Sequence, residues 1–206
     1  MLRIDPDRVV DAARRHLVPP PSSPRPAIFL DRDGTLIEEV NFLSKVEDMR
    51  IFPGTISALE RFRDAGYALI VVTNQSGIGR GLYSTDDMDA IHRAMQKELG
   101  GLIDAFYFCP HLPDEGCVCR KPSIGMIERA VAEHGILLGR SWVIGDKALD
   151  IELGRNAGTR TALVATGYGS GLSDEQRSKA DVSAKDIGDA ADRILAYEFN
   201  EVTAAS

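Results

Sequence analysis

The sequence lacks the features that mark a membrane, secreted or nucleic-acid-binding protein. Its 206 residues contain no apolar run of the about 18 residues that a membrane-spanning helix needs. The first 17 residues have no apolar signal core, and their arginines alternate with aspartates, so a cytoplasmic location is expected. With 24 Lys and Arg against 31 Asp and Glu, the net charge of −7 disfavours nucleic acid or an anionic membrane as a partner.

Cysteine is also scarce. The three cysteines are an odd number and lie between residues 109 and 119, so a disulfide framework is not expected. The rest of the composition, 44% hydrophobic and 27% charged, is that of an ordinary globular protein. The length fits one domain with an appendage.

The chain divides into an N-terminal extension, a main domain and a short tail. Residues 1–25 combine an apolar stripe over 9–17 with a proline-rich run over 19–24, which predicts a short helix and a stiff linker. We expect this extension to dock on the domain or at a subunit contact. Residues 26–198 form the main domain, and residues 199–206 are expected to fray.

From residue 26 onward, short apolar runs alternate with amphipathic stretches. Strands are expected at 27–30, 68–72, 105–108, 141–144 and 161–164. Helices are expected at 54–65, 85–99, 123–135 and 148–157, followed by a short strand and a closing helix over 186–197. This alternation predicts an α/β fold, a single Rossmann-like, three-layer domain with a central parallel sheet covered on both faces.

Polar residues follow almost every predicted strand. Asp31-Arg32-Asp33-Gly34-Thr35 follow the first strand, Thr73 to Gly77 the second, Cys109-Pro110-His111 the third and Gly145-Asp146-Lys147 the fourth. Ligands of parallel sheets bind at the carboxyl ends of the strands. The sequence therefore predicts one site built from these segments.

Asp31 and Asp33 form the most informative pair. They stand two residues apart at the end of an extended segment, so we expect both side chains on one face and Arg32 pointing away. Two carboxylates so close repel each other, and Mg²⁺, held also by Asp146, would remove that conflict. A plain turn is the alternative, since Asp and Gly favour turns, but it does not explain the polar residues at the other strand ends.

This arrangement suits the transfer of a phosphoryl group. Asp31 would attack phosphorus and form an aspartyl-phosphate. Asp33 would protonate the leaving alkoxide and then take a proton from water. Mg²⁺ would neutralise charge on the transferred group, while Thr73 and Lys121 would contact its oxygens.

The cysteines belong to a second pattern, C-x-H-x₅-C-x-C. Cys109, His111, Cys117 and Cys119 offer three thiolates and one imidazole, which suit a tetrahedral, structural Zn²⁺. Free thiols beside an incidental histidine are the alternative. An Arg-Lys pair follows directly, so the metal would fix two cations beside the site. A nucleic-acid-binding zinc finger disagrees with the acidic charge and with the C-x-H order.

Four segments together resemble the motifs of the haloacid dehalogenase superfamily. They are D-R-D-G-T at 31–35, V-V-T-N-Q-S-G at 71–77, R-K-P at 120–122 and I-G-D-K at 144–147. The resemblance implies the same nucleophile, Asp31, and the same acid/base, Asp33. It also implies phosphoryl contacts from Thr73 and Lys121, and magnesium held by Asp31, Asp146 and the carbonyl of Asp33.

Within that superfamily, C-P-H followed by C-x-C-R-K-P resembles a small group without a large cap domain. The group contains D-glycero-D-manno-heptose 1,7-bisphosphate phosphatases and histidinol-phosphate phosphatases. The short spacing from His111 to Cys117 resembles the histidinol-phosphate branch, whereas T-N-Q-S-G-I-G-R-G at 73–81 resembles the heptose branch. The second segment lies at the substrate, so we expect removal of the C7 phosphate of the heptose bisphosphate. The resemblance to the family also implies a monomer. A non-catalytic zinc-loop binding protein is an alternative of another class.

Resemblance to the heptose branch implies further contacts with a sugar phosphate. The residues concerned are Glu39, Val40, Asn41, Phe42, Asn74, Gln75, Ser76, Arg120 and Lys147. Those at 40–42 depart from the residues usual in that branch. Arg120 would clamp the second phosphate, since a guanidinium binds phosphate in a fork. Two roles remain open for Asp150, which could brace Lys147 or cap the helix. His92 is interpreted as a packing or surface residue.

Overall fold

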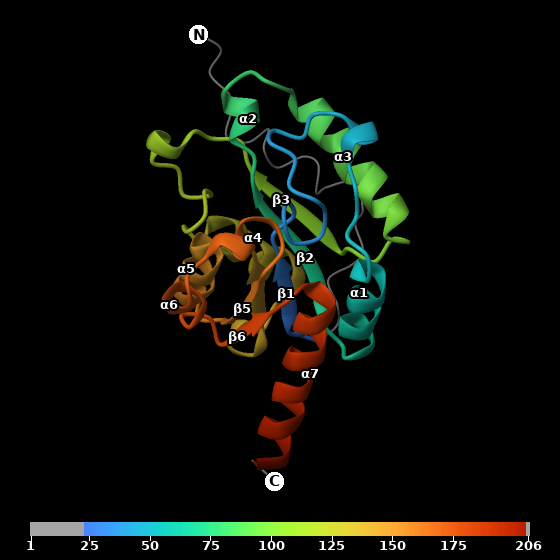
Figure 1. Ribbon diagram of the computed structural model, residues 1–206, viewed down its shortest axis with the longest axis vertical. Coiled ribbons are helices and arrows are strands. Elements are labelled where there is room, and N and C mark those ends of the chain that lie inside the picture. Colours follow the sequence, from blue (N-terminus) through green and yellow to red (C-terminus); the bar gives the residue numbers. More distant parts are fainter. Residues whose placement is uncertain (1–22, 205–206) are drawn as a thin grey trace.

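The computed structural model describes residues 23–204 of the chain, with side chains as far as residue 200. Across the described residues, the centre is a six-stranded, wholly parallel sheet with the order β3-β2-β1-β4-β5-β6 (Figure 1). The strands are β1 (Ala27–Leu30), β2 (Ala68–Asn74), β3 (Ala105–Cys109), β4 (Trp142–Gly145), β5 (Arg160–Val164) and β6 (Val182–Ala184). This is the strand order of a Rossmann-like sheet, as predicted.

Helices cover both faces of the sheet because the strands are apolar on both sides. In β1, Ile28 and Leu30 belong to the core on one face, and Ala27 and Phe29 to the core on the other. The first face is covered by α1 (Thr55–Asp64), α3 (Thr85–Glu98) and α7 (Ile187–Ala204), and the second by α4 (Gly125–His134) and α5 (Ala148–Ala157). The predicted three-layer domain is confirmed.

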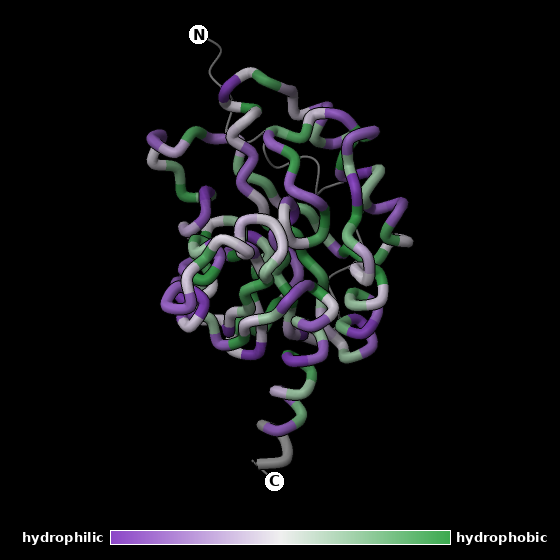
Figure 2. Tube along the Cα trace, viewed as in Figure 1, coloured by the Kyte–Doolittle hydropathy of each residue, from purple (hydrophilic) through white to green (hydrophobic). Residues whose placement is uncertain are grey.

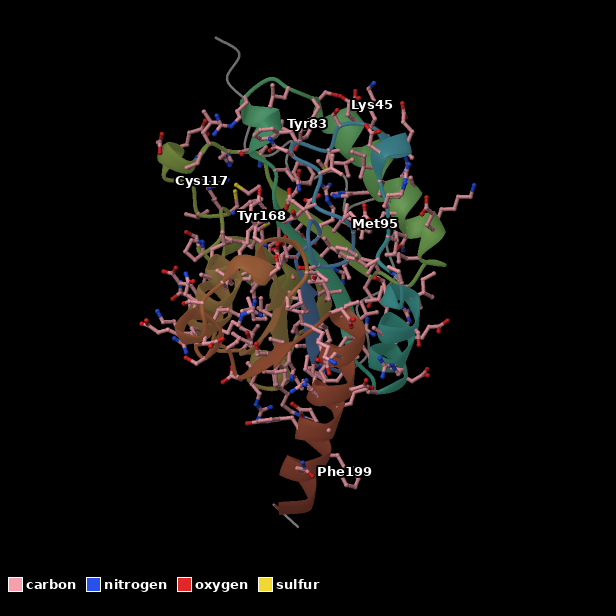
Figure 3. All side chains as sticks on the ribbon, viewed as in Figure 1. Lys45, Tyr83, Met95, Cys117, Tyr168 and Phe199 are labelled. Carbon is pink, nitrogen blue, oxygen red and sulfur yellow. The ribbon has the colours of Figure 1, made fainter. Side chains whose placement is uncertain are left out.

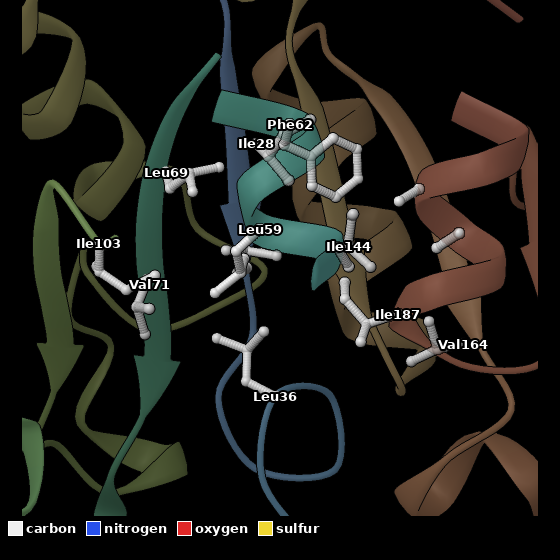
Figure 4. Packing of buried hydrophobic residues seen from close by; sticks show 14 of the residues in the cluster. Ile28, Leu36, Leu59, Phe62, Leu69, Val71, Ile103, Ile144, Val164 and Ile187 are labelled. Carbon is white, nitrogen blue, oxygen red and sulfur yellow. The ribbon is translucent and has the colours of Figure 1, made fainter. Parts of the chain in front are cut away.

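The larger core lies between the sheet and the layer that contains α1. Figure 4 shows Leu59 and Phe62 of this helix against Ile28, Leu69 and Ile144 of the strands, and all five side chains are fully buried. Burial of side chains of this size stabilises the fold by roughly 1.5–3 kcal/mol each. Hydrophobic residues run through the centre, while hydrophilic residues gather along the outer loops (Figure 2). The strand ends are therefore held by a well-packed body.

Short elements occupy the connections. They are η3 (Val46–Asp48), α2 (Ser76–Gly79), η4 (Pro113–Glu115), η5 (Leu138–Arg140), η6 (Gly167–Gly171) and α6 (Asp174–Arg177). Within residues 23–204, none of these connections is large enough to form a separate cap domain, as expected. In the same range, no helix combines the length and the apolar character that crossing a membrane requires.

The five strands predicted from the sequence are confirmed, and helix ends differ by a few residues. Gly135 and Gly158 take left-handed φ angles of 63° and 71° as C-caps of α4 and α5, the positions at which the sequence predicts helix ends. The closing helix is longer than predicted, since α7 continues to Ala204 through most of the expected frayed tail. The predicted N-terminal helix and most of the proline-rich linker lie outside the described residues.

The sheet grows in opposite directions from its two central strands. From β1 it extends to β2 and β3, and from β4 to β5 and β6. Connections that leave two neighbouring strands in opposite directions open a crevice at their carboxyl ends, where ligands bind. Asp31 follows β1 and Asp146 follows β4, so both stand at this crevice.

Candidate active site

Three aspartates converge at the crevice. The backbone amide of Asp31 donates to the carbonyl of Ile144, at 2.9 Å, which sets the end of β1 beside the end of β4. Asp31, Asp146 and Asp150 are buried, and each offers a carboxylate oxygen within 4.8 Å of the others. Carboxylates packed this closely repel one another unless a cation lies among them.

Asp146 has a buried carboxylate oxygen that lacks a hydrogen-bond donor in the described part of the chain. Its Oδ2 accepts a hydrogen bond from the amide of Tyr168 at 2.7 Å, whereas its buried Oδ1 accepts none from the described residues. Burial, and next the charge of Asp31, raise the pKa of Asp146 to about 7. A hard divalent cation would satisfy the oxygen and relieve the repulsion, and these oxygen donors are those that Mg²⁺ prefers. Asp31 and Asp146, two of the predicted ligands, therefore fit a magnesium site.

Two glycines let the backbone close over Asp146. Gly34 has a φ of +81°, and a Cβ built on it would stand 2.3 Å from Asp146 Oδ2. Gly167, with a φ of +53°, would bring a Cβ to the same oxygen at 2.3 Å. No other residue type fits this approach without a shift, so the sequence needs glycine on both sides of the carboxylate.

A buried lysine balances two of the acids. Lys121 Nζ lies 2.8 Å from Asp31 Oδ1 and 2.6 Å from Asp150 Oδ1. Burial lowers the pKa of Lys121, but the two carboxylates outweigh it, so its pKa is raised and the ammonium stays charged. Burial alone would raise the pKa of Asp31. The positive charges of Lys121 and then of Lys147 outweigh the effect of burial, so the pKa of Asp31 lies below its ordinary value. Asp31 is therefore an anion at neutral pH.

Lys147 stands at the mouth of the crevice. Its Nζ lies 3.3 Å from Glu39 Oε2, 3.6 Å from Asp146 Oδ1 and 4.0 Å from Asp31 Oδ2. These carboxylates raise the pKa of Lys147, although its burial acts in the opposite direction. The structure thus places the predicted residues Glu39 and Lys147 in contact beside the nucleophile candidate.

The predicted segment 73–76 is used largely to hold other site residues. Asn74 Oδ1 accepts from the amide of Lys121 at 3.0 Å, and Asn74 Nδ2 donates to its carbonyl at 3.2 Å. Gln75 Nε2 donates to Asp33 Oδ2 and to Thr73 Oγ1, both at 2.8 Å, and Gln75 Oε1 accepts from the hydroxyl of Tyr83 at 2.6 Å. The two amide side chains therefore fix Lys121, Thr73 and Asp33 relative to one another.

Arg32 does not point away from the acids, and this prediction is wrong. Its guanidinium donates from Nε to Asp33 Oδ2 at 3.0 Å and from Nη2 to Asp33 Oδ1 at 2.9 Å. The alternation of an extended strand stops after Leu30, because the amides of Leu36 and Ile37 donate back to the carbonyl of Arg32 and close a turn. Neighbouring side chains can then meet, and the carboxylate of Asp33 turns toward Arg32 and Gln75.

A cleft of about 100 Å³ opens beside the acids. The residues that line it are Arg32, Asp33, Glu39, Val40, Asn41, Phe42, Leu43, Asn74, Gln75, Ser76, Tyr83 and Lys147. The two segments predicted to contact substrate, 39–42 and 74–76, thus both line it. Arg120 lies on the neighbouring loop, where its Nη1 donates to the carbonyl of His111 at 3.1 Å. A second hollow of about 410 Å³, between that loop and α4, has none of the site aspartates in its lining.

The four predicted zinc ligands form one cluster on that loop. Cys109 Sγ lies 3.5 Å from both His111 Nδ1 and Cys117 Sγ, and Cys119 Sγ lies 3.3 Å from His111 Nδ1 and 3.6 Å from Cys117 Sγ. Tetrahedral bonds of about 2.3 Å to sulfur and about 2.0 Å to nitrogen would place ligand atoms about 3.5–3.8 Å apart. The donor set and its spacing therefore fit a four-ligand metal site.

Hydrogen bonds tie this loop to the crevice. The amide of Gln75 donates to the carbonyl of Cys109 at 2.7 Å, and the amide of Gly79 donates to the carbonyl of Pro110 at 3.0 Å. Arg120 and Lys121 follow the last cysteine of the loop directly. Order in the loop is therefore transmitted to Lys121 and to the 73–76 segment.

Sequence reasoning missed several residues that the structure places at the site. Asp150 caps α5, one of the two roles considered for it, by accepting from the amide of Lys147 at 3.1 Å, but its pairing with Lys121 was not predicted. Tyr168, from the Gly-rich turn after β5, lies with its ring 4.6 Å from Lys147 Nζ. Tyr83 reaches the site through Gln75 (both tyrosines are labelled in Figure 3). Only the acid four positions after Asp146 and the G-Y-G-S-G turn gave a signal in the sequence.

At the switch point of this parallel sheet lie an anionic aspartate, a buried lysine and a cluster of carboxylates that could bind a metal ion. This arrangement is the architecture of a phosphoric monoester hydrolase. Residues 118–190 match a HAD-hydrolase-like family model. The chain is 41% identical over 191 residues to the D-glycero-D-manno-heptose-1,7-bisphosphate 7-phosphatase of Thermosynechococcus vestitus, covering 84% of this chain and 97% of that protein. It is 43% identical over 151 residues to the D-glycero-alpha-D-manno-heptose-1,7-bisphosphate 7-phosphatase of Photorhabdus laumondii, covering 68% and 82%.

A solved structure agrees with these relatives. The D,D-heptose 1,7-bisphosphate phosphatase of B. bronchiseptica, crystallised with magnesium and phosphate, superposes with a TM-score of 0.74 at 32% identity, covering 84% of this chain and 99% of that one. The chain belongs to the haloacid dehalogenase-like hydrolases, in the family that includes these heptose bisphosphate phosphatases. It is an enzyme that hydrolyses phosphate monoesters, and the interpretation as a non-catalytic binding protein is set aside.

Proposed function

We propose that the enzyme removes the C7 phosphate of D-glycero-D-manno-heptose 1,7-bisphosphate. The observation that carries the proposal is the Asp31–Lys121 pair at the switch point, with an anionic oxygen and a buried ammonium 2.8 Å apart. The relatives that match most of this chain and are named for this reaction support the choice of substrate. Their names include both alpha and beta forms of the sugar, so the proposal covers the position of the phosphate and not the anomer.

The proposed reaction begins with Asp31. One of its carboxylate oxygens attacks phosphorus, the bond from phosphorus to the sugar oxygen breaks, and a phosphoryl group is carried on Asp31. Lys121, held by Asp150 and by the amide of Asn74, presents positive charge to the phosphoryl oxygens. The hydroxyl of Thr73, fixed by Gln75, is the second group directed at these oxygens.

Asp33 is the proposed acid and base. It gives its proton to the departing sugar oxygen, and it then takes a proton from the water that attacks the phosphorylated Asp31. Inorganic phosphate leaves, and Asp31 and Asp33 return to their starting states. The exposed fraction of Asp33 is 8%, so its carboxylate is shielded but still borders the cleft.

Mg²⁺ is the proposed cofactor, and the carboxylates of Asp31 and Asp146 with the carbonyl of Asp33 would hold it. Bound there, it would neutralise charge on the transferred group and orient it. The buried Oδ1 of Asp146, which accepts no hydrogen bond from the described residues, is the observation that supports this assignment.

The sugar and its second phosphate are assigned to the cleft. The residues that line it include Glu39, Val40, Asn41, Phe42 and Ser76. Lys147 stands at the mouth, and Arg120 supplies a further cation on the metal-binding loop. We assign Zn²⁺ to Cys109, His111, Cys117 and Cys119 as a structural ion, because four protein ligands leave no position for water.

The test compares two substrates on the same enzyme preparation. The ratio kcat/KM should be far higher for heptose 1,7-bisphosphate than for histidinol phosphate, and phosphorus NMR should show loss of the C7 phosphate alone. A preference for histidinol phosphate would reverse the substrate assignment. Asp31→Asn should abolish phosphate release from both esters with the fold intact, and activity in that variant would overturn the choice of nucleophile.

A further inference from the structure

A fully buried cation lies beside Asp33, the proposed acid and base. Arg32 is 0% exposed and is among the largest fully buried side chains of the described residues. Burial of a guanidinium is costly unless it is paired and hydrogen-bonded, and a buried ion pair often adds little net stability. The presence of Arg32 directly beside Asp33 therefore needs an explanation other than stability of the fold.

The contacts of Arg32 fix the plane of its guanidinium. Nε and Nη2 fork the Asp33 carboxylate at 3.0 and 2.9 Å, and Nη1 donates to Met88 Sδ at 2.8 Å on the other side. His92 Nε2 lies 3.5 Å from Nη1, and the imidazole stacks on Phe106 with ring centroids 4.6 Å apart. Burial, and then the charge of Arg32, hold the pKa of His92 well below its usual range, so no second positive charge competes there. The guanidinium has one orientation, and the carboxylate must match it.

The two oxygens of Asp33 are not equivalent. Oδ2 accepts from Arg32 Nε at 3.0 Å and from Gln75 Nε2 at 2.8 Å, which uses both of its lone pairs, and Arg32 Nη2 also lies 2.9 Å from it. Among the described residues, Oδ1 accepts from Arg32 Nη2 alone. One lone pair of Oδ1 is therefore left to exchange a proton.

On this geometry, and resting on the proposed phosphatase reaction, we propose that Arg32 is a positioning residue that aims Asp33 Oδ1 at the leaving oxygen of the substrate. A two-point fork fixes both the position and the plane of a carboxylate, which a single ammonium does not. General acid catalysis needs that alignment, because a small displacement of the proton donor costs a large factor in rate. Arg32 acts through Asp33 and does not itself touch the substrate.

The test uses two leaving groups. A sugar alkoxide needs a proton in order to leave, whereas p-nitrophenolate leaves without one. The ratio kcat/KM includes only steps up to departure of the first product, so it excludes the later hydrolysis of phosphorylated Asp31. Arg32→Met should lower kcat/KM for heptose 1,7-bisphosphate by about a hundredfold, the lower end of what a general acid contributes, and for p-nitrophenyl phosphate by less than about fivefold.

A double-mutant cycle separates positioning from a general effect on the fold. In an Asp33→Ala background, Arg32→Met should change kcat/KM for the sugar ester by less than about twofold, because the group that it aims is gone. Arg32→Lys keeps the charge without the fork and should recover little of the loss. Arg61→Met removes a surface arginine paired with Asp192 and is the matched control. It should leave kcat/KM unchanged for both the heptose ester and p-nitrophenyl phosphate.

Three results would overturn the proposal. They are equal losses on both esters in Arg32→Met, full activity in Arg32→Lys, and a loss in the Asp33→Ala background as large as in the wild type. Arg32→Gln, which keeps a planar donor, replaces the Met variant in the same comparison if that variant does not fold. If the wild type cleaves p-nitrophenyl phosphate but not heptose 1,7-bisphosphate, only the substrate assignment is wrong. Histidinol phosphate then replaces the heptose ester as the substrate whose leaving group needs a proton. If it cleaves no ester, both proposals fail.

Discussion

Replacement of Asp150 by asparagine tests how the buried charges of the site are balanced. Asp150 is fully buried, its Oδ1 lies 2.6 Å from Lys121 Nζ, and its Oδ2 accepts from the amide of Lys147 at 3.1 Å. Asparagine has nearly the same volume and keeps an oxygen that accepts from that amide. The substitution therefore removes the charge opposite Lys121 while it keeps the cap of α5.

The magnitude follows from the two partners of Lys121. Loss of the only partner of a buried charge costs about 3–5 kcal/mol. Lys121 keeps Asp31 at 2.8 Å, so we expect roughly half of that loss, about 2 kcal/mol of unfolding free energy. For a chain of this size, about 2–4 °C is lost per kcal/mol, which gives a fall in Tm of about 4–8 °C.

Urea unfolding and calorimetry of the zinc-loaded protein without magnesium measure this difference. Asp192→Asn is the matched control, because Asp192 pairs with Arg61 and its side chain is 69% exposed, so its loss should stay below about 1 kcal/mol. An Asp150→Asn protein as stable as this control would refute the charge-balance argument.

Three further predictions concern the glycine beside the acids, a buried histidine and the metal-binding loop. Gly34→Ala should cost about 1–3 kcal/mol and weaken Mg²⁺ binding measured by calorimetry, because its Cβ would stand 2.3 Å from Asp146 Oδ2. The pKa of His92 is lowered in the folded protein, so its imidazole stays neutral there, whereas in the unfolded chain it gains a proton below the ordinary pKa of 6.5. The free energy of unfolding should therefore decrease as the pH is lowered below that value. About 1.4 kcal/mol should be lost for each pH unit below that value, and urea titrations of His92→Phe should lack this slope. Cys117→Ser should lower the zinc content and the activity together, measured by metal analysis and phosphate release.

Each of these predictions has a control within the chain. Gly54 has a φ of +82° but no atom within 4 Å of a built Cβ, so Gly54→Ala shows the backbone cost without the contact with Asp146. A pH slope in His92→Phe equal to that of the wild type would contradict the account of the histidine. Full activity of a zinc-free Cys117→Ser protein would show that the loop does not order Lys121.

The fold and the main site residues follow from the sequence because strand ends are local features. Asp31, Thr73 and Asp146 each come directly after, or at the end of, a short apolar run, and the parallel order brings those ends to one edge. The zinc pattern is equally local, since all four ligands lie within residues 109–119. These predictions require only that the strands be found and that they be parallel.

Contacts between side chains could not be predicted from the sequence, because they depend on turns and on packing across the sheet. Arg32 was assigned by strand alternation, which stops at the turn after Leu30. The charge pair between Asp150 and Lys121 joins α5 to the loop before α4, and nothing in either segment alone specifies it. His92 is buried against Arg32 through the packing of α3 on the sheet, whereas its helical position suits a surface residue equally well.

The separation between strand ends and connecting loops has a consequence for how such an enzyme can diversify. The reacting acids sit at the strand ends of the packed body, and the cleft residues 74–76 hold them in place, whereas the cleft wall at 39–43 belongs to the connection between β1 and α1. We expect that exchange of this connection for another of similar span would change the ester that is bound while the residues that act on phosphorus stayed in place. A library confined to 39–43 is therefore the economical route to new specificities.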